Sequence, residues 1–145
     1  MEKSFIIHYL FIFVILTCSC ALITYWCFPD HKWRVHVMSD ISDNIVAHIK
    51  SGDDDLGSHT LPFNGEYEWS FCNRVDGKTL FYGYFWWGSR YQTLALFDNN
   101  ILDICAVPAF TNSDCYWSIR PDGFYASPSN SPLGDDNWQF IKSWG

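Results

Sequence analysis

The chain has 145 residues, enough for one ordinary domain plus an export segment, and 19% of its residues are aromatic. This excludes a disordered tail, because so much aromatic surface does not remain in contact with water in an isolated chain. The formal net charge of -7 repels phosphate backbones, so we expect no nucleic acid partner.

The chain begins with an apolar block that predicts export. No Asp, Glu, Lys or Arg occurs from Ser4 to Pro29, and Ser19-x-Ala21 satisfies the small-x-small rule for a signal-peptidase site. We therefore expect residues 1–21 to be a cleaved secretory signal, with cleavage as late as residue 27 as an alternative.

An uncleaved signal anchor is the other interpretation, since the whole block is long enough to span about 30 Å of hydrocarbon. In both cases the domain that follows, residues 28–145, lies on the far side of the membrane. After cleavage we expect a secreted, extracellular protein without a membrane contact.

Cysteine usage agrees with an oxidising compartment. Cleavage after Ala21 leaves Cys27, Cys72, Cys105 and Cys115. We expect a disulfide between Cys105 and Cys115, which would stabilise the fold by roughly 2.8 kcal/mol at most. Cys27 and Cys72 could also pair, but later cleavage would remove Cys27 and leave a free thiol, so this pairing stays open. No C-x-x-C or H-x3-H spacing occurs, and no metal site is expected.

Beyond the leader, apolar residues recur with a period of two, which is typical of half-buried strands. The expected strands are 33–38, 45–50, 66–72, 79–87, 91–97, 101–107, 115–120, 124–127 and 137–144. Turn-forming residues separate them, and no segment outside the leader shows a helical stripe. The pattern predicts an all-β fold, a compact antiparallel β-sandwich of about 7–9 short strands.

Two of these strands have clear faces. In 66–72, three aromatic residues alternate with Glu66, Glu68 and Ser70, so the polar face should contact water. The segment 79–87 is apolar on both faces, as in a central or covered strand. Trp86 and Trp87 are adjacent there, so their rings should lie on opposite sides of the sheet.

The run Asp53, Asp54 and Asp55 is a candidate calcium site, because clustered carboxylates suit a hard cation. The spacing argues against it: with Asp53 as position 1 of a calcium loop, Ser58 replaces the required Gly and Asn64 the required Glu. We expect the run to form a tight turn closed by Gly57 or to contact a partner.

His36, His48 and His59 could serve in catalysis with Ser51, Ser70 or the aspartate run at residues 53–55. No G-x-S-x-G elbow, H-E-x-x-H pair or Cys/His signature accompanies them. Isolated histidines in strands are usually structural, so we expect no enzyme and no catalytic residue.

Several segments, in this order, resemble the plant self-incompatibility S-protein family and its homologues. They are Val35-His36-Val37, Ala47-His48-Ile49-Lys50-Ser51-Gly52-Asp53-Asp54-Asp55-Leu56-Gly57, Tyr67-Glu68-Trp69-Ser70-Phe71, Thr79-Leu80-Phe81-Tyr82-Gly83-Tyr84-Phe85-Trp86, Asp103-Ile104-Cys105, Asp114-Cys115-Tyr116-Trp117 and Asp122-Gly123-Phe124-Tyr125. The resemblance covers about residue 33 to the end. It implies a small secreted plant protein with a compact β-sandwich, and it supplies no catalytic residues or cofactor.

The chain departs from the family at two positions. The family commonly has a cysteine after the residue matching His48 and another after the aromatic residues of the fourth segment, and these two usually form a disulfide. This chain has Ile49 and Gly83 there. Both partners are lost together, and Ile49 could fill part of the space.

The founding family member is a stigma-side signal that inhibits incompatible pollen. The resemblance therefore implies a ligand for cell-cell recognition, here a monomer that binds a cell-surface receptor or a cell-wall component. We expect the loops 40–44, 52–60, 73–78 and 127–136 to make the contact. Their acidic residues are Asp53, Asp54, Asp55, Asp76, Asp135 and Asp136, which suggests a basic patch on the partner. The alternatives are a carbohydrate-binding module that uses Trp86 or Trp87 and, third, a small secreted hydrolase.

Overall fold

The fold was analysed in a computed structural model that describes residues 27, 31–73, 76, 78–106, 113–131 and 137–145. The predicted leader and the acidic residues Asp135 and Asp136 lie outside the described residues. Within the described part, no helix has the length and apolar character needed to cross a bilayer.

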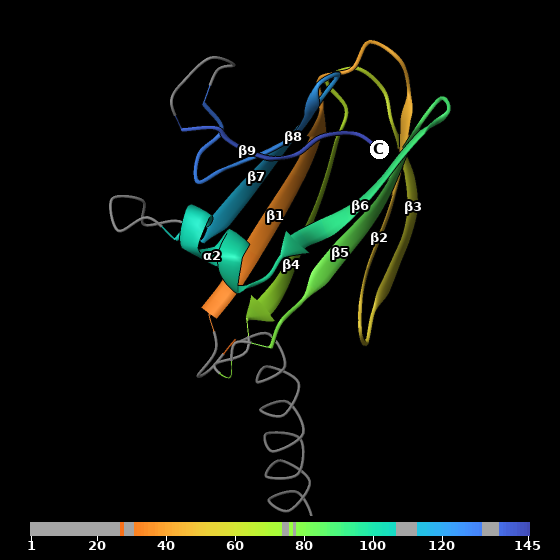
Figure 1. Cartoon of the computed structure of the whole chain (residues 1–145). Helices are drawn as coiled ribbons and strands as arrows, with labels where there is room; N and C mark the ends of the chain where they lie inside the picture. Colours follow the sequence, from red (N-terminus) through yellow and green to blue (C-terminus); the bar gives the residue numbers. More distant parts are fainter. Residues whose placement is uncertain (1–26, 28–30, 74–75, 77, 107–112, 132–136) are drawn as a thin grey trace, which may run out of the picture.

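The structure is all-β, with two sheets packed face to face (Figure 1). One sheet has the strand order β4-β1-β7-β8-β9 and the other β3-β2-β5-β6. The strands are β1 (His31–Ser39), β2 (Ile45–Ser51), β3 (Asp55–Leu61), β4 (Glu66–Asn73), β5 (Phe81–Trp87), β6 (Arg90–Phe97), β7 (Asp114–Arg120), β8 (Gly123–Ser127) and β9 (Gln139–Lys142). The predicted all-β sandwich is confirmed.

The pairing is antiparallel with one exception. Every pair in the four-stranded sheet is antiparallel, but β1 and β7 run parallel in the five-stranded sheet. A parallel pair requires a crossover connection. The chain between β1 and β7 provides this connection, and it includes all four strands of the second sheet. The expectation of a purely antiparallel sandwich is therefore corrected at this pair.

Aromatic side chains from both sheets fill the space between the layers. Trp33 of β1 contacts Phe97 of β6, with ring centroids 5.3 Å apart, and Phe85 of β5 contacts Phe124 of β8 at 5.1 Å. The fully buried Trp117 donates its indole N–H across the core to the carbonyl of Leu96 at 3.0 Å. This bond satisfies a polar group that would otherwise be costly to bury.

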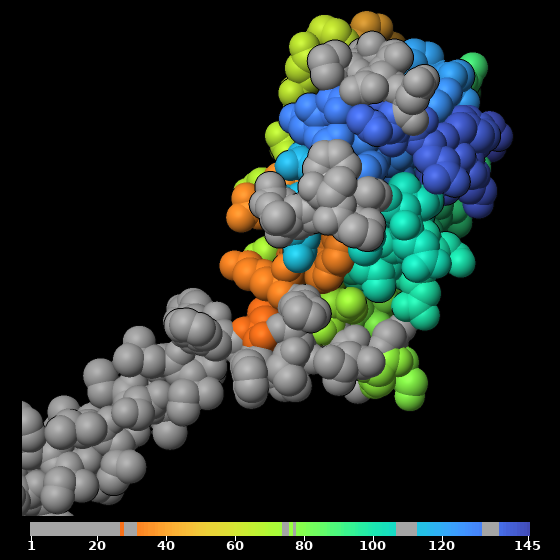
Figure 2. Space-filling view, turned by 90° about the vertical axis from the view of Figure 1, so that its left-hand side faces the viewer, coloured from red at the N-terminus to blue at the C-terminus, as the bar shows by residue number. Residues whose placement is uncertain are grey.

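The predicted strand 101–107 is wrong, because Asn99–Cys105 forms a helix, α2. Asp98 caps it by accepting a hydrogen bond from the backbone N–H of Ile101 at 2.9 Å. Ile101 and Cys105 are buried one turn apart, a spacing that suits a helix. Figure 2 shows α2 (turquoise) below the dark blue C-terminal residues on the same side of the molecule.

The sequence analysis also missed a strand. It placed a loop at 52–60, whereas β3 begins at Asp55 and pairs with β2 alone. As an edge strand with a mostly polar sequence and one buried residue, Leu61, β3 lacks the apolar alternation that identifies a buried strand. The other strands coincide with prediction within a few residues, and the polar face of β4 is exposed as expected.

The four cysteines of the described residues form two disulfides. Cys105 and Cys115 are joined, with Cα atoms 5.3 Å apart, which confirms the prediction. Cys27 is joined to Cys72 at a Cα separation of 5.5 Å, which answers the question that the sequence left open. The second bridge ties the segment before β1 to the end of β4.

Candidate binding site at the acidic end of the sandwich

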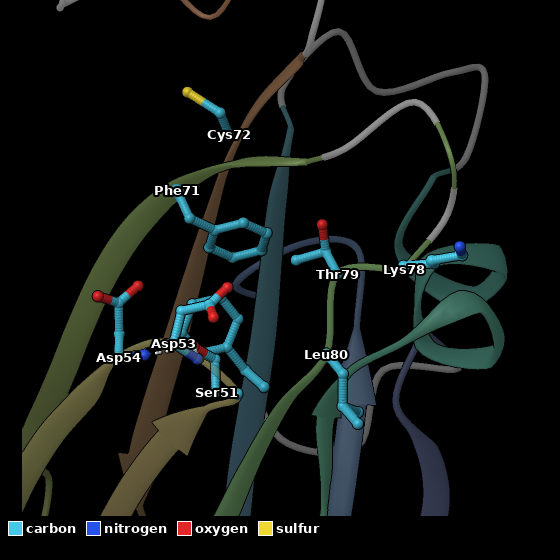
Figure 3. A pocket seen from close by; sticks show the side chains of 10 residues that line it. Ser51, Asp53, Asp54, Phe71, Cys72, Lys78, Thr79 and Leu80 are labelled. Atoms are coloured by element: carbon cyan, nitrogen blue, oxygen red, sulfur yellow. Dashed lines mark hydrogen bonds between the residues drawn. The ribbon is translucent and has the colours of Figure 1, made fainter.

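A cleft of about 430 Å³ lies at one end of the sandwich, where the β2–β3 turn approaches the end of β4 and the start of β5 (Figures 1 and 3). Phe71, Leu80 and Phe81 supply its apolar lining, and the β2–β3 turn supplies two carboxylates. Leu80 is 46% exposed, so an apolar surface remains open to a partner. The strand topology brings these segments together from separate parts of the sequence.

The turn is held by a serine. The Ser51 hydroxyl accepts hydrogen bonds from the backbone N–H groups of Asp53 and Asp54 at 3.3 and 3.0 Å. The Ser51 backbone N–H donates to the Asp54 carbonyl at 2.7 Å and closes the turn. Because the serine provides the acceptor, both exposed aspartate side chains are left facing solvent beside the cleft, and no described residue forms an ion pair with either.

Asp55 has a different role from its two neighbours. Its Oδ1 lies 2.7 Å from Nε2 of His48 and accepts a hydrogen bond from the Gly57 N–H at 2.9 Å. The hydrogen bond with His48, followed by that from Gly57, lowers the pKa of Asp55 below its ordinary value. Gly57 has a φ of 82°, which favours glycine, so the predicted turn chemistry holds for Asp55. Asp55 therefore starts β3 and does not line the cleft.

Of the remaining aspartates predicted to contact a partner, the structure places one. Asp76 is exposed at the same end of the sandwich, in the β4–β5 connection, and its Oδ1 accepts a hydrogen bond from the Lys78 backbone N–H at 3.2 Å. Lys78 lines the cleft, and Figure 3 shows its side chain directed toward α2, while the Phe71 ring points into the hollow. Asp135 and Asp136 are outside the described residues, so their predicted contact role is untested.

The predicted loops do not form one surface. The loop 40–44 precedes β2 and the turn 52–54 follows it, so a whole strand separates them and they lie at opposite ends of the sandwich (Figure 1). Of the predicted loops, only the β2–β3 turn and the β4–β5 connection contribute to the cleft, which is called the acidic cleft below. Lys78 belongs to the predicted contact loop 73–78, whereas sequence reasoning missed Phe71 and Leu80 as lining residues, because no local signal marks residues that become neighbours through sheet packing.

Each of the three histidines considered for catalysis contacts a carboxylate or a backbone carbonyl. His48 contacts Asp55, and Nε2 of His59 lies 2.8 Å from the Leu56 carbonyl while its ring stacks on Tyr67. His36 contacts carboxylates on neighbouring strands. Within the described part of the chain, no serine hydroxyl hydrogen-bonds to any of the three histidines.

The tryptophan pair divides as predicted. Trp86 is 39% exposed on the outer face of β5, whereas Trp87 packs against the core beside Trp144 at a ring separation of 5.7 Å. Tyr84 and Tyr91 flank Trp86 on the outer face, with ring centroids 6.4 and 5.4 Å away. This row of aromatic rings is a second surface with the character of a binding site.

Comparison with known sequences shows similarity to one family. The family described as plant self-incompatibility protein S1 matches residues 34–144. S-protein homolog 5 of Arabidopsis thaliana is 36% identical over 80 residues, which span 54% of this chain and 57% of that protein. S-protein homolog 2 of the same plant is 29% identical over 98 residues, 66% of this chain and 60% of that protein. The chain thus spans less than two thirds of the length of these relatives.

A solved structure shares the fold. It belongs to the "SPH (Self-Incompatibility Protein Homologue) proteins, a widespread family of small, highly stable, secreted proteins from plants". The TM-score is 0.56 at 14% sequence identity, and the match covers 81% of this chain and 97% of the other. At this identity the similarity establishes the arrangement of the strands and nothing finer.

Proposed function

The chain belongs to the plant self-incompatibility protein S1 family, and from this premise we propose that it is a secreted recognition protein that binds a receptor through its acidic cleft. The observation that carries the proposal is the serine-held turn, which presents Asp53 and Asp54 beside an apolar surface. A preorganised turn loses little conformational entropy on binding. The protein would act as a monomer and through binding alone.

The chemistry of the cleft indicates the kind of side chain it receives. A lysine or arginine of the partner can pack its aliphatic stem on Phe71 and Leu80 while its charged head meets the carboxylates. A charged encounter of this kind accelerates association at low ionic strength. The on-rate should therefore fall as salt is added, and an on-rate independent of salt would contradict charge steering.

Secretion is part of the proposal. It is supported by the apolar leader, by two disulfides in the described structure and by the description of the structurally similar proteins as secreted. Within this function, rejection of self pollen is the narrower role. Expression confined to the stigma would support that role, and expression confined to vegetative tissue would contradict it.

The proposal is tested by binding the labelled protein to membranes prepared from plant tissue. We expect saturable binding that trypsin treatment of the membranes abolishes, because the receptor is a protein. Replacing Asp53 and Asp54 together by Asn should weaken binding at least tenfold. Asp103→Asn is the matched control, since Asp103 is an exposed carboxylate on α2 away from the cleft. Equal loss in both variants, or trypsin-resistant binding, would contradict the proposal.

The exposed aromatic row favours a second candidate function, the binding of a cell-wall polysaccharide. Flat aromatic faces such as that of Trp86 stack on the apolar faces of sugar rings. In pull-downs on wall polysaccharides, retention should then depend on Trp86. Phe63→Ala is the control, because Phe63 is an exposed aromatic residue outside the row. Retention that survives Trp86→Ala would exclude this candidate.

A catalytic function is tested by incubation with generic ester, glycoside and RNA substrates. We expect no turnover. Turnover that is abolished by His48→Ala would establish an enzyme and contradict the binding proposal.

A further inference from the structure

A buried histidine on the outer face of the five-stranded sheet is surrounded by carboxylates from neighbouring strands. His36 is only 7% exposed, although it points away from the core between the sheets. The strand register places Glu68 of β4 opposite it on one side and Tyr116 of β7 on the other. The Tyr116 ring stacks on the imidazole at a centroid distance of 4.4 Å, which fixes the plane of the ring.

The two ring nitrogens of His36 face different carboxylates. Nδ1 lies 2.6 Å from Oε1 of Glu66 and 3.3 Å from Oε2 of Glu68. Nε2 lies 3.4 Å from Oδ1 of Asp114, which is itself 3.8 Å from Nε of Arg34. A histidine that binds a metal through one nitrogen commonly donates its other N–H to a carboxylate, and Asp114 stands in that position.

The cluster carries excess negative charge. Three carboxylates contribute -3 and Arg34 contributes +1, so with a neutral imidazole the sum is -2. A divalent cation would balance this charge. Within the described part of the chain, these are the charged groups in contact with His36, from β1, β4 and β7.

We propose that Nδ1 of His36 and the carboxylates of Glu66 and Glu68 bind a zinc ion, with Asp114 positioning the imidazole. The three ligand atoms lie within 4.8 Å of one another, close enough for one ion to reach them all. Imidazole nitrogen and carboxylate oxygen are both ligand types that zinc binds in proteins, and three protein ligands leave one position of a four-coordinate site open. Calcium and magnesium prefer oxygen ligands alone, so the histidine discriminates against them.

The site can adjust to an ion without a change in the fold. The side chains of Glu66 and Glu68 are 41% and 55% exposed, so they are free to rotate to metal-ligand distances of about 2.0–2.2 Å. The imidazole is held by its neighbours, so only the two carboxylates need to move. The proposal is independent of receptor binding, because none of these residues lines the acidic cleft.

The test uses the untagged protein as it is secreted, after bound metal ions have been removed with a chelating resin. Calorimetric titration with zinc chloride should show one ion bound per chain, and cobalt chloride should give the visible absorption of a tetrahedral site. Zinc should also raise the unfolding midpoint, because it binds the folded chain alone. Calcium at the same concentration should neither bind to the chain nor raise its unfolding midpoint.

Variants locate the ion. Glu66→Gln and Glu68→Gln should each weaken zinc binding at least tenfold without loss of the fold, since both side chains are exposed. Asp114→Asn should weaken binding by about 10–100-fold while leaving the three ligands in place. Asp54→Asn is the control and should leave zinc affinity unchanged. Absence of binding, equal binding of calcium, or zinc binding insensitive to Glu66→Gln would show an ion-pair network around His36 and overturn the proposal.

Discussion

Ile49 and Gly83 are directly opposed in the antiparallel pair of β2 and β5. These are the two positions at which the family resemblance implies a bridging cysteine pair. Here Ile49 is fully buried, and a Cβ atom on Gly83 would lie 2.5 Å from Cε2 of Phe85 and 2.9 Å from Cδ1 of Leu96. The side chains of Phe85 and Leu96 thus occupy the space beside Gly83.

This packing predicts that Gly83→Ala destabilises the protein. The added methyl group would displace the Phe85 ring, and overpacking of this kind costs about 1–3 kcal/mol. Gly52→Ala is the matched control, since no atom lies within 4 Å of a Cβ at that position. Chemical denaturation measures both; equal free energies of unfolding for Gly83→Ala and the parent would contradict tight packing around Gly83.

The second disulfide predicts where the mature protein begins. Because Cys27 is bonded to Cys72, signal cleavage must occur before residue 27 for this bridge to persist. Mass spectrometry of the secreted protein should find an N-terminus between residues 22 and 27 and no free thiol. A chain that starts after Cys27, with Cys72 free, would show that the bridge is absent from the mature protein.

Loss of that bridge should be costly. Replacement of Cys27 and Cys72 by Ser should lower the free energy of unfolding by about 4 kcal/mol on the chain-entropy estimate for a loop of this length. Thermal unfolding of the double variant measures the effect. An unchanged midpoint would mean that the bridge does not constrain the unfolded chain.

Asp55 predicts a pH-dependent contribution to stability. Its pKa is lowered in the folded protein by the hydrogen bonds with His48 and Gly57, so the folded state favours the ionised form. The contribution is therefore present above the ordinary aspartate pKa of about 3.9 and is lost as the pH falls through the lower folded value. Asp55→Asn should lower the unfolding midpoint at pH 7, and this difference should disappear in strong acid. A difference for Asp55→Asn that persists in strong acid would contradict the assignment.

Removal of the N-terminal cap of α2 should destabilise the protein moderately. Asp98→Ala removes the acceptor for the Ile101 N–H and should lower the free energy of unfolding by about 1 kcal/mol. Asp103→Ala on the exposed face of α2 is the control. If both variants are as stable as the parent, the cap does not stabilise the helix.

The aspartate run predicts no calcium dependence. Asp55 is engaged with His48, and the turn that holds Asp53 and Asp54 is closed by Ser51. Added calcium should therefore leave the unfolding midpoint unchanged. A calcium-dependent rise that Asp54→Asn removes would reveal an ion site at this turn.

The local sequence pattern was sufficient to predict most of the strands, but it was insufficient to predict α2 and β3. The alternation of Glu66, Trp69 and Phe71 identified both faces of β4 correctly, because period two is a property of the strand itself. The apolar residues of α2 were assigned to a strand because Asp98 was interpreted as part of a turn and not as a helix cap. β3 was missed because this edge strand carries only two apolar residues, Leu56 and Leu61, at positions that do not alternate with a period of two.

The candidate sites were predictable in part. The acidic turn at Asp53 and Asp54 was identified from the run of aspartates, and strand geometry placed the rings of Trp86 and Trp87 on opposite sides of the sheet; the structure showed that Trp86 is the exposed one. The apolar lining by Phe71 and Leu80 was not, because these residues meet the turn only through the packing of two sheets. Spacing motifs also gave no sign of the cluster around His36, whose contacts with Glu66 and Asp114 span 30 and 78 residues of sequence.

The order of residues along this chain was enough to predict export, and to determine the inward-facing positions of most strands and the family to which the chain belongs. These properties depend on runs and alternations within single segments, where neighbouring side chains obey the geometry of one strand. Sheet register decided which distant residues become neighbours in the opposition of Ile49 and Gly83 and in the carboxylates around His36. The Cys27–Cys72 bridge likewise joins residues that are 45 positions apart in the sequence. Register arises from the cooperative burial of both faces at once, and no single segment contains that information.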